Sequence, residues 1–267
     1  MDWHFLGWLA VLLYLGAEAL SIVSLLTPRG RGFASALLVA GLLLQFVDLQ
    51  LRARALGSVP YRTLAGSMSL FGWLLGVAYL ALLFRHRERA IGPFLIPFIV
   101  LFSAIGLLIP FHASTPRPGT QGVVFALHVT LAILGYAAFT LSFVLSLLYL
   151  IQSRQIRRAK TGVLFSRLPA LEVIGRMNRT AVTIGLSSLS VSVLLGAAWA
   201  RKVWSGVVDA KLLFAVFTLL VYGFLLWMDR RGWKGQRVAL LSIGGFGLVI
   251  FSYTFVNLFL SRAHTFR

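Results

Sequence analysis

The chain has 267 residues, of which 59% are hydrophobic and only 12% are charged. A soluble domain carries about 25% charged residues and cannot bury so much apolar surface, so the composition excludes a soluble protein and indicates an integral membrane protein. The absence of cysteine excludes disulfides, thiolate metal sites and cysteine nucleophiles. The net charge of +18 does not indicate nucleic-acid binding, because the basic residues lie in short clusters between apolar runs, as in proteins oriented in a lipid bilayer.

Eight apolar runs are each close to the length of about 20 residues that a helix needs to cross the hydrocarbon core. They cover residues 5–26, 33–51, 64–84, 90–110, 123–151, 181–200, 211–228 and 238–260. The sequence therefore predicts an all-α, polytopic membrane protein with about eight transmembrane helices. The first run has no basic region before it and no small-residue cleavage site after it, so we expect it to be a retained helix rather than a signal peptide.

The segments that follow the first, third, fifth and seventh runs hold most of the 25 basic residues. By the positive-inside rule these segments are cytoplasmic, which predicts both termini on the outer side. The fifth run is longer than a bilayer requires and is expected to tilt or to project. We expect residues 152–180, which are basic and partly apolar, to form an amphipathic helix at the cytoplasmic surface. No repeat of 20–50 residues is visible, so a single domain over residues 1–267 is predicted.

Two of the five histidines, His128 and His264, are expected near one plane at the outer surface. His128 lies about six residues into the fifth run, roughly 9 Å along the helix axis, and His264 follows the eighth run. Neutral imidazole is a common axial ligand of haem iron. The alternative is that His128 is a hydrogen-bonded structural residue and His264 a solvated one.

The segment 199–211, between the sixth and seventh runs, is rich in aromatic and charged residues. These are Trp199, Arg201, Lys202, Trp204, Asp209 and Lys211. Tryptophan is an ordinary anchor at the membrane interface. The functional alternative is an aromatic platform for a flat apolar ligand whose carboxylates are bound by the basic side chains. Haem has this character, with a large π-face and two propionates.

Glu18 and Asp48 fall inside the first and second runs, where acidic side chains are costly and usually face the bundle interior or a cavity. Each is expected either to bond a neighbouring Ser or Tyr or to belong to a polar pathway.

Small residues in the sixth and eighth runs indicate close helix packing. They are Ser187, Ser188, Ser190, Ser192, Gly244, Gly245 and Gly247. Motifs of soluble enzymes are missing, which favours an assembly factor over an enzyme.

Five groups of residues follow one another in an order and spacing that chance rarely produces. They are 128–139 with 147–152, 168–172 (Leu-Pro-Ala-Leu-Glu), 196–211, 232–235 (Gly-Trp-Lys-Gly) and 256–264. Together they resemble the cytochrome c assembly family, which includes CcsA, ResC and the HemX/YpjD-like proteins. The resemblance covers about residue 60 to the C-terminus and is strongest from His128 onward.

The resemblance implies a haem-binding site. In that family a periplasmic tryptophan-rich loop presents haem, and two external histidines ligate the iron. Carried over by position, His128 and His264 are the metal ligands, and Trp199, Trp204 and Asp209 match parts of the loop. The neighbouring bases Arg201 and Lys202 are then expected at the propionates of a transiently bound haem b.

The resemblance also implies a function: a haem-binding, haem-handling protein of cytochrome c maturation in the bacterial cytoplasmic (inner) membrane, presenting haem at the outer face. Its expected partners are a ResB-like membrane protein or apocytochrome c, because the chain itself has no thiol. The alternative is a HemX-like regulatory or scaffolding protein without bound haem, with the basic connector 152–180 as its working surface. A permease that uses Glu18 and Asp48 is less favoured, because paired Pro-broken helices and inverted repeats are missing.

The chain departs from the pattern of a full CcsA synthetase subunit at several positions. Four residues stand where the family's loop has Trp, Pro and Glu: Val207, Val208, Ala210 and Leu212. Leu225 lies near the expected position of a transmembrane histidine, and Gly66 replaces the Glu of an early Glu-Ser-Leu motif. These departures favour the divergent HemX/YpjD-like branch.

Overall fold

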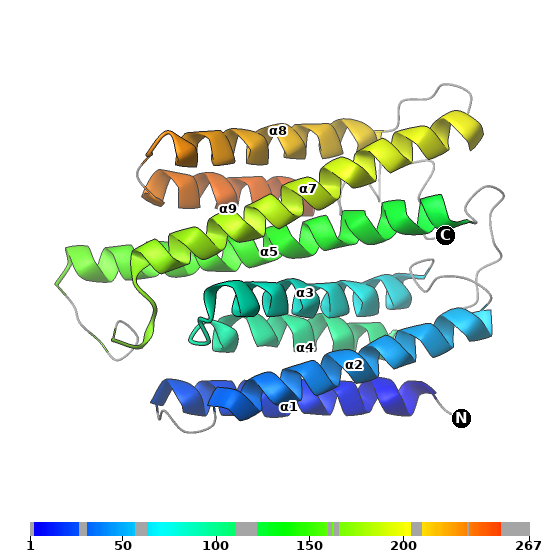
Figure 1. Ribbon diagram of the computed structural model, residues 1–267, viewed down its shortest axis with the longest axis horizontal. Helices are drawn as coiled ribbons and strands as arrows, with labels where there is room; N and C mark the ends of the chain where they lie inside the picture. The colour runs from blue at the N-terminus through cyan, green and yellow to red at the C-terminus, as the bar shows by residue number, and fades with distance from the viewer. Residues whose placement is uncertain are drawn as a thin grey trace. The chain divides into compact units, whose positions relative to one another are not determined.

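A computed structural model describes residues 3–26, 31–56, 63–109, 122–159, 162, 166–203, 210–233 and 235–251. Within these residues the chain is all-helical, as predicted, with eight helices and no strand (Figure 1). The helices are α1 (Trp3–Leu26), α2 (Arg31–Leu56), α3 (Leu64–His86), α4 (Gly92–Leu108), α5 (Val123–Arg157), α7 (Leu171–Val203), α8 (Ala210–Arg230) and α9 (Gly235–Phe251).

Six of the described helices are long and apolar enough to cross a membrane: α1, α2, α3, α5, α7 and α8. The two shorter ones, α4 and α9, are also apolar and have 17 described residues each. That length is at the lower limit for a spanning helix. Each of the eight predicted runs therefore corresponds to one helix, and the prediction of a polytopic membrane protein is confirmed.

The chain folds as two compact units. Unit 1 comprises residues 1–116 and 159–170, and unit 2 comprises residues 117–158 and 171–267. That the two units together form one domain over residues 1–267 stays a prediction.

In unit 1 the four helices close into a ring, because α1 packs on α2 and α4, and α3 packs on α4 and α2. A buried polar cluster joins all four. The hydroxyl of Tyr14 on α1 donates to Gln45 Oε1 on α2 at 2.7 Å. Gln45 Nε2 donates to the Ser69 carbonyl on α3 at 3.0 Å and to Ser103 Oγ on α4 at 3.1 Å. The buried amide is therefore satisfied at both ends, as burial in an apolar bundle requires.

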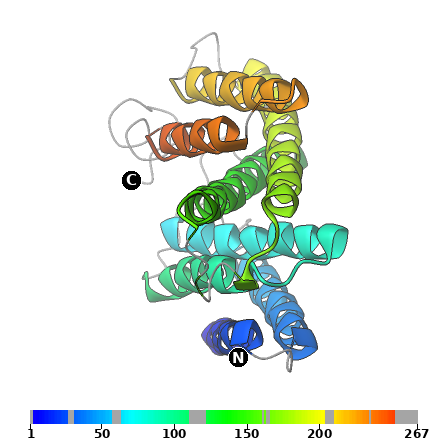
Figure 2. The same ribbon diagram turned by 90° about the vertical axis from the view of Figure 1, so that its left-hand side faces the viewer.

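In unit 2 the same ring recurs, because α5 packs on α7 and α9, and α8 packs on α7 and α9 (Figure 2). The core is mostly apolar, with Phe139 of α5 stacked on Tyr222 of α8 at 3.7 Å between ring centroids. Gly185 of α7 makes room for this pair, since a Cβ there would lie 2.5 Å from Phe139 Cε1. The core thus ties α5, α7 and α8 together.

The predicted surface helix over 152–180 was wrong within the described residues, because its two ends belong to the long helices α5 and α7. The apolar run ends where charges begin, but the helical backbone continues. At the start of α7, Ile174 and Met177 are fully buried, while Arg176 forms an exposed ion pair with Glu172, 2.7 Å away and four residues earlier. Buried contacts on one face and charge pairs on the other extend the helix beyond the apolar run.

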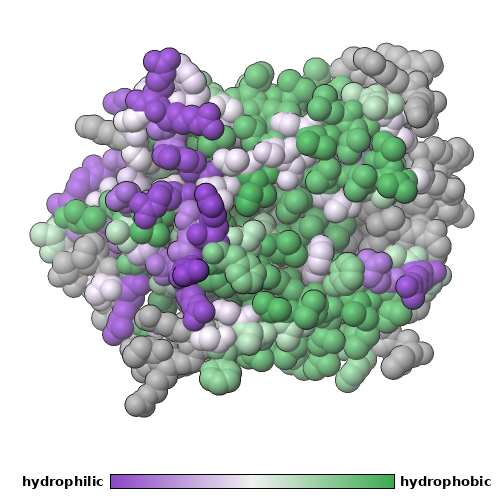
Figure 3. All heavy atoms as spheres, viewed as in Figure 1, coloured by the Kyte–Doolittle hydropathy of each residue, from purple (hydrophilic) through white to green (hydrophobic). Residues whose placement is uncertain are grey.

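The surface of unit 2 changes character along its helices. Hydrophobic side chains cover the middle, and hydrophilic ones gather where α5 and α8 end and α7 and α9 begin (Figure 3). Exposed apolar side chains on the helices of unit 2 include Leu194, Leu213, Phe217, Leu220, Phe224 and Leu240. The basic end of unit 2 is defined by Arg154, Arg157, Arg158, Arg176, Arg179, Arg230, Arg231 and Arg237. An apolar girdle with a basic end is the pattern expected of a membrane-embedded bundle. The outer location of the termini stays a prediction.

Candidate functional site

The candidate site lies at the end of unit 2 opposite the basic end, where α5 begins and α7 ends. It contains Phe125 and His128 of α5 and Ser192, Gly196 and Trp199 of α7. Residues three or four apart share one face of a helix, so each helix presents one stripe to the other. We refer to these five residues as the His128 cluster.

The His128 ring is held by α7. Its Nδ1 lies 2.7 Å from the carbonyl oxygen of Ser192, and the Ser192 hydroxyl donates back to the His128 carbonyl at 2.7 Å. A carbonyl oxygen only accepts hydrogen bonds, so Nδ1 carries the proton and the lone pair of the neutral ring is on Nε2. Histidines that bind metals commonly make this contact, which fixes the ring orientation and raises ligand basicity.

Gly196 forms the surface against which the His128 ring lies. A Cβ at this position would be 2.5 Å from Cε1 of the ring and 2.7 Å from Nδ1. These distances are shorter than any that real Cβ atoms show, so a larger residue would move the ring. The glycine is therefore needed for the close approach of α7 to His128.

The aromatic rings of the cluster lie beside His128. Phe125, which is 6% exposed, has its ring centroid 4.9 Å from that of Trp199 and 6.2 Å from that of His128. Trp199 is half-buried. An imidazole ligand next to aromatic surface is a donor set that suits a porphyrin, so the described residues fit haem.

The remaining predicted residues of the site are only partly described. Arg201 and Lys202 lie in the last turn of α7, and their side chains are outside the described part of the structure. Trp204, Asp209 and His264 lie outside the described residues altogether. The predicted pairing of His128 with His264 and the predicted tryptophan platform thus stay predictions. Among the described residues there is no group of three or more His, Asp or Glu side chains that could hold a metal ion.

Asp48 has no hydrogen bond to a Ser or Tyr among the described residues, and its place in a polar pathway stays a prediction. It pairs with Arg52 of the same helix, with Nε 3.0 Å from Oδ1 and Nη2 2.9 Å from Oδ2. Gly7 of α1 allows the close packing over this pair, because a Cβ there would lie 3.2 Å from Arg52 Nη2. One carboxylate oxygen of Glu18, Oε2, is buried without a hydrogen-bond partner among the described residues, and nothing in the structure explains it.

Two departures from the family pattern have structural counterparts. Leu225 is 1% exposed and packs in the apolar core of unit 2, so an apolar side chain fills the position expected for a transmembrane histidine. Gly66 is buried in the first turn of α3, where its N–H donates to Thr63 Oγ1 at 3.0 Å and caps the helix.

Two bundles with apolar girdles and a histidine held by a neighbouring helix define a polytopic membrane protein with a candidate haem ligand. A family model described as cytochrome C assembly protein matches residues 61–264. Since that is more than half of the chain, the chain belongs to the cytochrome c assembly family. Membership of this family supports a role in cytochrome c maturation. The matched region includes residues of both units.

Relatives of two kinds match. The chain is 25% identical to "Cytochrome c biogenesis protein CcsA" of Synechococcus sp. (strain JA-3-3Ab), over 96% of this chain and 90% of the relative. It is 26% identical to the CcsA of Chlamydomonas reinhardtii, over 96% of this chain and 72% of that protein. It is 29% identical to "Protein HemX" of Bacillus subtilis (strain 168), over 79% of this chain and 78% of that protein. Both expected branches of the family are therefore represented.

The residues that hold His128 were less apparent from the sequence than His128 itself. Ser192 was predicted only to help helix packing, and Gly196 belonged to the resemblance without a role. The available signal was spacing, because Ser192, Gly196 and Trp199 are four and three residues apart and so share a face of one helix. Phe125 and His128 are spaced in the same way on α5.

Proposed function

We propose that the chain binds haem at the His128 cluster and presents it during cytochrome c maturation, at the outer face of the bacterial cytoplasmic membrane. The observation that supports this most is the hydrogen bond from His128 Nδ1 to the Ser192 carbonyl. It leaves the lone pair of the ring on Nε2, which is the form of histidine that ligates iron.

In this proposal His128 supplies one axial ligand and His264 the other. Trp199 and Trp204 lie against the porphyrin face. Asp209 belongs to the same loop. Arg201 and Lys202 bind the propionates. The haem b supplies the iron porphyrin that a cytochrome c receives, and filled axial positions protect the iron. The thiols that receive haem belong to a partner, apocytochrome c, with a ResB-like membrane protein as a second partner, because the chain has no cysteine.

The test is the visible absorption spectrum of the full chain, purified in detergent after expression with ample haem. We expect a haem band that is lost or strongly weakened in His128→Ala. The matched control is His86→Ala, which removes the histidine in the last turn of α3 in unit 1 and should leave the band unchanged. A colourless wild-type protein, or equal spectra of wild type and His128→Ala, would count against the proposal.

A second candidate is a HemX-like regulatory or scaffolding protein without bound haem, which we retain because relatives named HemX also match the chain. Its working surface would be the basic connector 152–180, whose described ends belong to α5 and α7. Replacing the exposed Arg176 and Arg179 with Gln would then abolish cytochrome c maturation in cells, whereas His128→Ala would not. The haem proposal predicts instead that His128→Ala abolishes maturation and that the two arginine replacements do not.

A further inference from the structure

The turn between α8 and α9 lies at the basic end of unit 2 and has a defined backbone conformation. Gly232 has a φ of +78°, in the left-handed region that favours glycine. The N–H of Gly232 donates to the Asp229 carbonyl at 3.1 Å, and the N–H of Trp233 donates to the Met228 carbonyl at 3.2 Å. These two bonds form a Schellman motif, which ends α8. The motif therefore holds Arg231 and Trp233 in place just beyond the helix.

Two arginines at this turn lie over tryptophan rings. Arg231 Cζ is 5.1 Å from the ring centroid of Trp227, and Arg237 Cζ is 5.3 Å from that of Trp233. The two tryptophans are 51% and 40% exposed, and we refer to these four residues as the Trp–Arg pairs. A guanidinium that lies over an aromatic face keeps the N–H donors of its plane available, and this fork fits phosphate oxygens. Neither arginine forms an ion pair among the described residues.

An exposed apolar stripe on α8 leads to the first pair. Its members are spaced three or four residues apart, so they share one face of the helix. They are Leu213, Phe217, Leu220, Phe224 and Trp227. Arg231 continues this spacing, because its N–H donates to the Trp227 carbonyl at 3.0 Å, as in a helix. An apolar stripe that ends in a tryptophan and then an arginine has the order of lipid tails, interface and headgroups. The Trp–Arg pairs are therefore expected at the level of the lipid phosphates.

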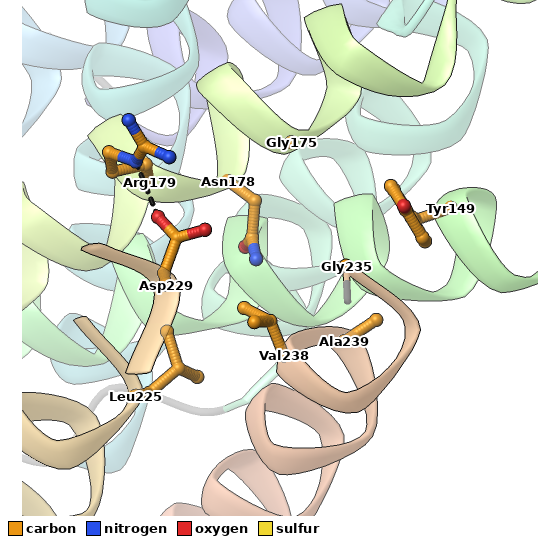
Figure 4. A pocket seen from close by; sticks show the side chains of 9 residues that line it. All are labelled: Tyr149, Gly175, Asn178, Arg179, Leu225, Asp229, Gly235, Val238 and Ala239. Atoms are coloured by element: carbon orange, nitrogen blue, oxygen red, sulfur yellow. Dashed lines mark hydrogen bonds and ion pairs between the residues drawn. The ribbon is translucent and has the colours of Figure 1, made fainter. Parts of the chain in front are cut away.

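The charge around the turn is positive. The acidic residues at this end are both ion-paired, Glu172 with Arg176 and Asp229 with Arg179, the second of which is drawn in Figure 4. The other arginines of the basic end have no acidic partner among the described residues. They are Arg154, Arg157, Arg158, Arg230, Arg231 and Arg237. A basic cluster beside a membrane surface attracts anionic lipids.

We propose that the Trp–Arg pairs of the α8–α9 turn bind the headgroup phosphates of anionic phospholipids. The guanidinium groups of Arg231 and Arg237 donate to the phosphate oxygens, and the acyl chains lie along the apolar stripe of α8. A zwitterionic lipid carries the same phosphate together with a cationic group, which the surrounding arginines repel, so the turn selects lipids with a net negative headgroup. The proposal does not depend on haem binding, since neither His128 nor haem takes part.

The experiment uses the full chain, delipidated in detergent, and two lipids of equal chain length: short-chain phosphatidylglycerol, which is anionic, and phosphatidylcholine, which is zwitterionic. Binding is measured by the rise in melting temperature with lipid concentration. We expect phosphatidylglycerol to bind at least about tenfold more tightly, with a smaller difference at high salt. Soluble glycerol phosphate should have no effect, because it has no acyl chains to lie on the stripe. Equal binding of the two lipids, or an equal effect of glycerol phosphate, would overturn the proposal.

Two double variants locate the binding. Arg231→Gln/Arg237→Gln removes both guanidinium groups of the Trp–Arg pairs, and both side chains are exposed, so the risk to folding is small. We expect its affinity for phosphatidylglycerol to fall at least about fivefold, and its affinity for phosphatidylcholine to change less than about twofold. The matched control is Arg85→Gln/Arg87→Gln, which removes two exposed arginines at the end of α3 in unit 1. The positive-inside rule places them on the same side of the membrane, and their loss should change either affinity less than about twofold.

Two outcomes would contradict a lipid site at this turn. Equal losses of phosphatidylglycerol affinity in the two double variants would mean that binding depends on net charge alone. Unchanged phosphatidylglycerol affinity in Arg231→Gln/Arg237→Gln would also overturn the proposal. If that variant then failed to support cytochrome c maturation in cells, the turn would contact an acidic protein partner instead.

Discussion

Units 1 and 2 are built in the same way and use their buried polar groups differently. Each is a closed ring of four helices, and in each the second helix carries a buried amide that bonds to at least one neighbouring helix. In unit 1 Gln45 has partners for both its oxygen and its nitrogen. In unit 2 only the oxygen of Asn178 has a partner among the described residues.

The difference indicates a division of roles. A fully bonded amide holds helices together, because each of its groups would be costly to expose to hydrocarbon. Asn178 links only α7 to α5, through its hydrogen bond from Ser142. Unit 1 also keeps its ion pair buried, with Asp48 and Arg52 at 0% and 3% exposure, whereas the Arg179 side chain of the ion pair in unit 2 is 50% exposed. We therefore expect substitutions of polar core residues to lower stability more in unit 1 than in unit 2.

The largest effect on stability is expected for Arg52→Met. It leaves the Asp48 carboxylate buried without its partner, which costs about 3–5 kcal/mol of unfolding free energy. Unfolding in detergent with increasing denaturant measures this. The double variant Asp48→Asn/Arg52→Met removes both charges and should recover most of the loss. A single variant as stable as wild type would show that the pair has no structural role.

A smaller loss, about 2 kcal/mol, is expected for Gln45→Leu, because Tyr14 loses its acceptor and two further hydrogen bonds vanish. The equivalent change in unit 2, Asn178→Leu, should cost less than about 1 kcal/mol, since it removes only one hydrogen bond. The same unfolding experiment compares them. If Asn178→Leu proved the more destabilising, the proposed division of roles would be wrong.

Gly196→Ala tests how α7 positions His128. The added Cβ would displace the ring, and we expect haem affinity to fall about tenfold, as when other groups that orient metal ligands are changed. The matched control is Gly223→Ala on α8, where a Cβ would meet no atom within 4 Å. Haem titration followed by absorbance measures both. Unchanged affinity in Gly196→Ala would show that the ring position does not matter for binding.

The smallest effect on stability is expected for Arg179→Gln, about 0.2–1 kcal/mol, because Arg179 is half-exposed and its ion pair with Asp229 is screened. Thermal unfolding measures this. A loss as large as that of Arg52→Met would mean that the basic end of unit 2 is held together by this pair.

The sequence predicted the helices well because long apolar runs have one stable form in lipid. It missed the start of α7, since hydropathy falls at the membrane boundary while the helical hydrogen bonds continue. It also missed the partner of Asp48, because Arg52 lay beyond the predicted end of the second run. The two-unit organisation was not visible, since the units share a helix arrangement and not a sequence repeat.

The sequence predicted the candidate iron ligand, His128, but not the residues that hold its ring in place. His128 stands out as a rare polar residue in an apolar run. The hydrogen bond to the carbonyl of Ser192 and the space left by Gly196 depend on how closely α5 and α7 approach, which no local pattern in the sequence specifies.

Ligation of haem iron by His128 is tested most directly by chemical rescue. The full chain with His128→Gly is loaded with haem, and its visible spectrum is recorded with and without added imidazole. We predict that the variant lacks the haem band of the wild type and that imidazole restores it, because free imidazole replaces the missing ligand. A His128→Gly spectrum identical to that of wild type, unchanged by imidazole, would contradict ligation by His128.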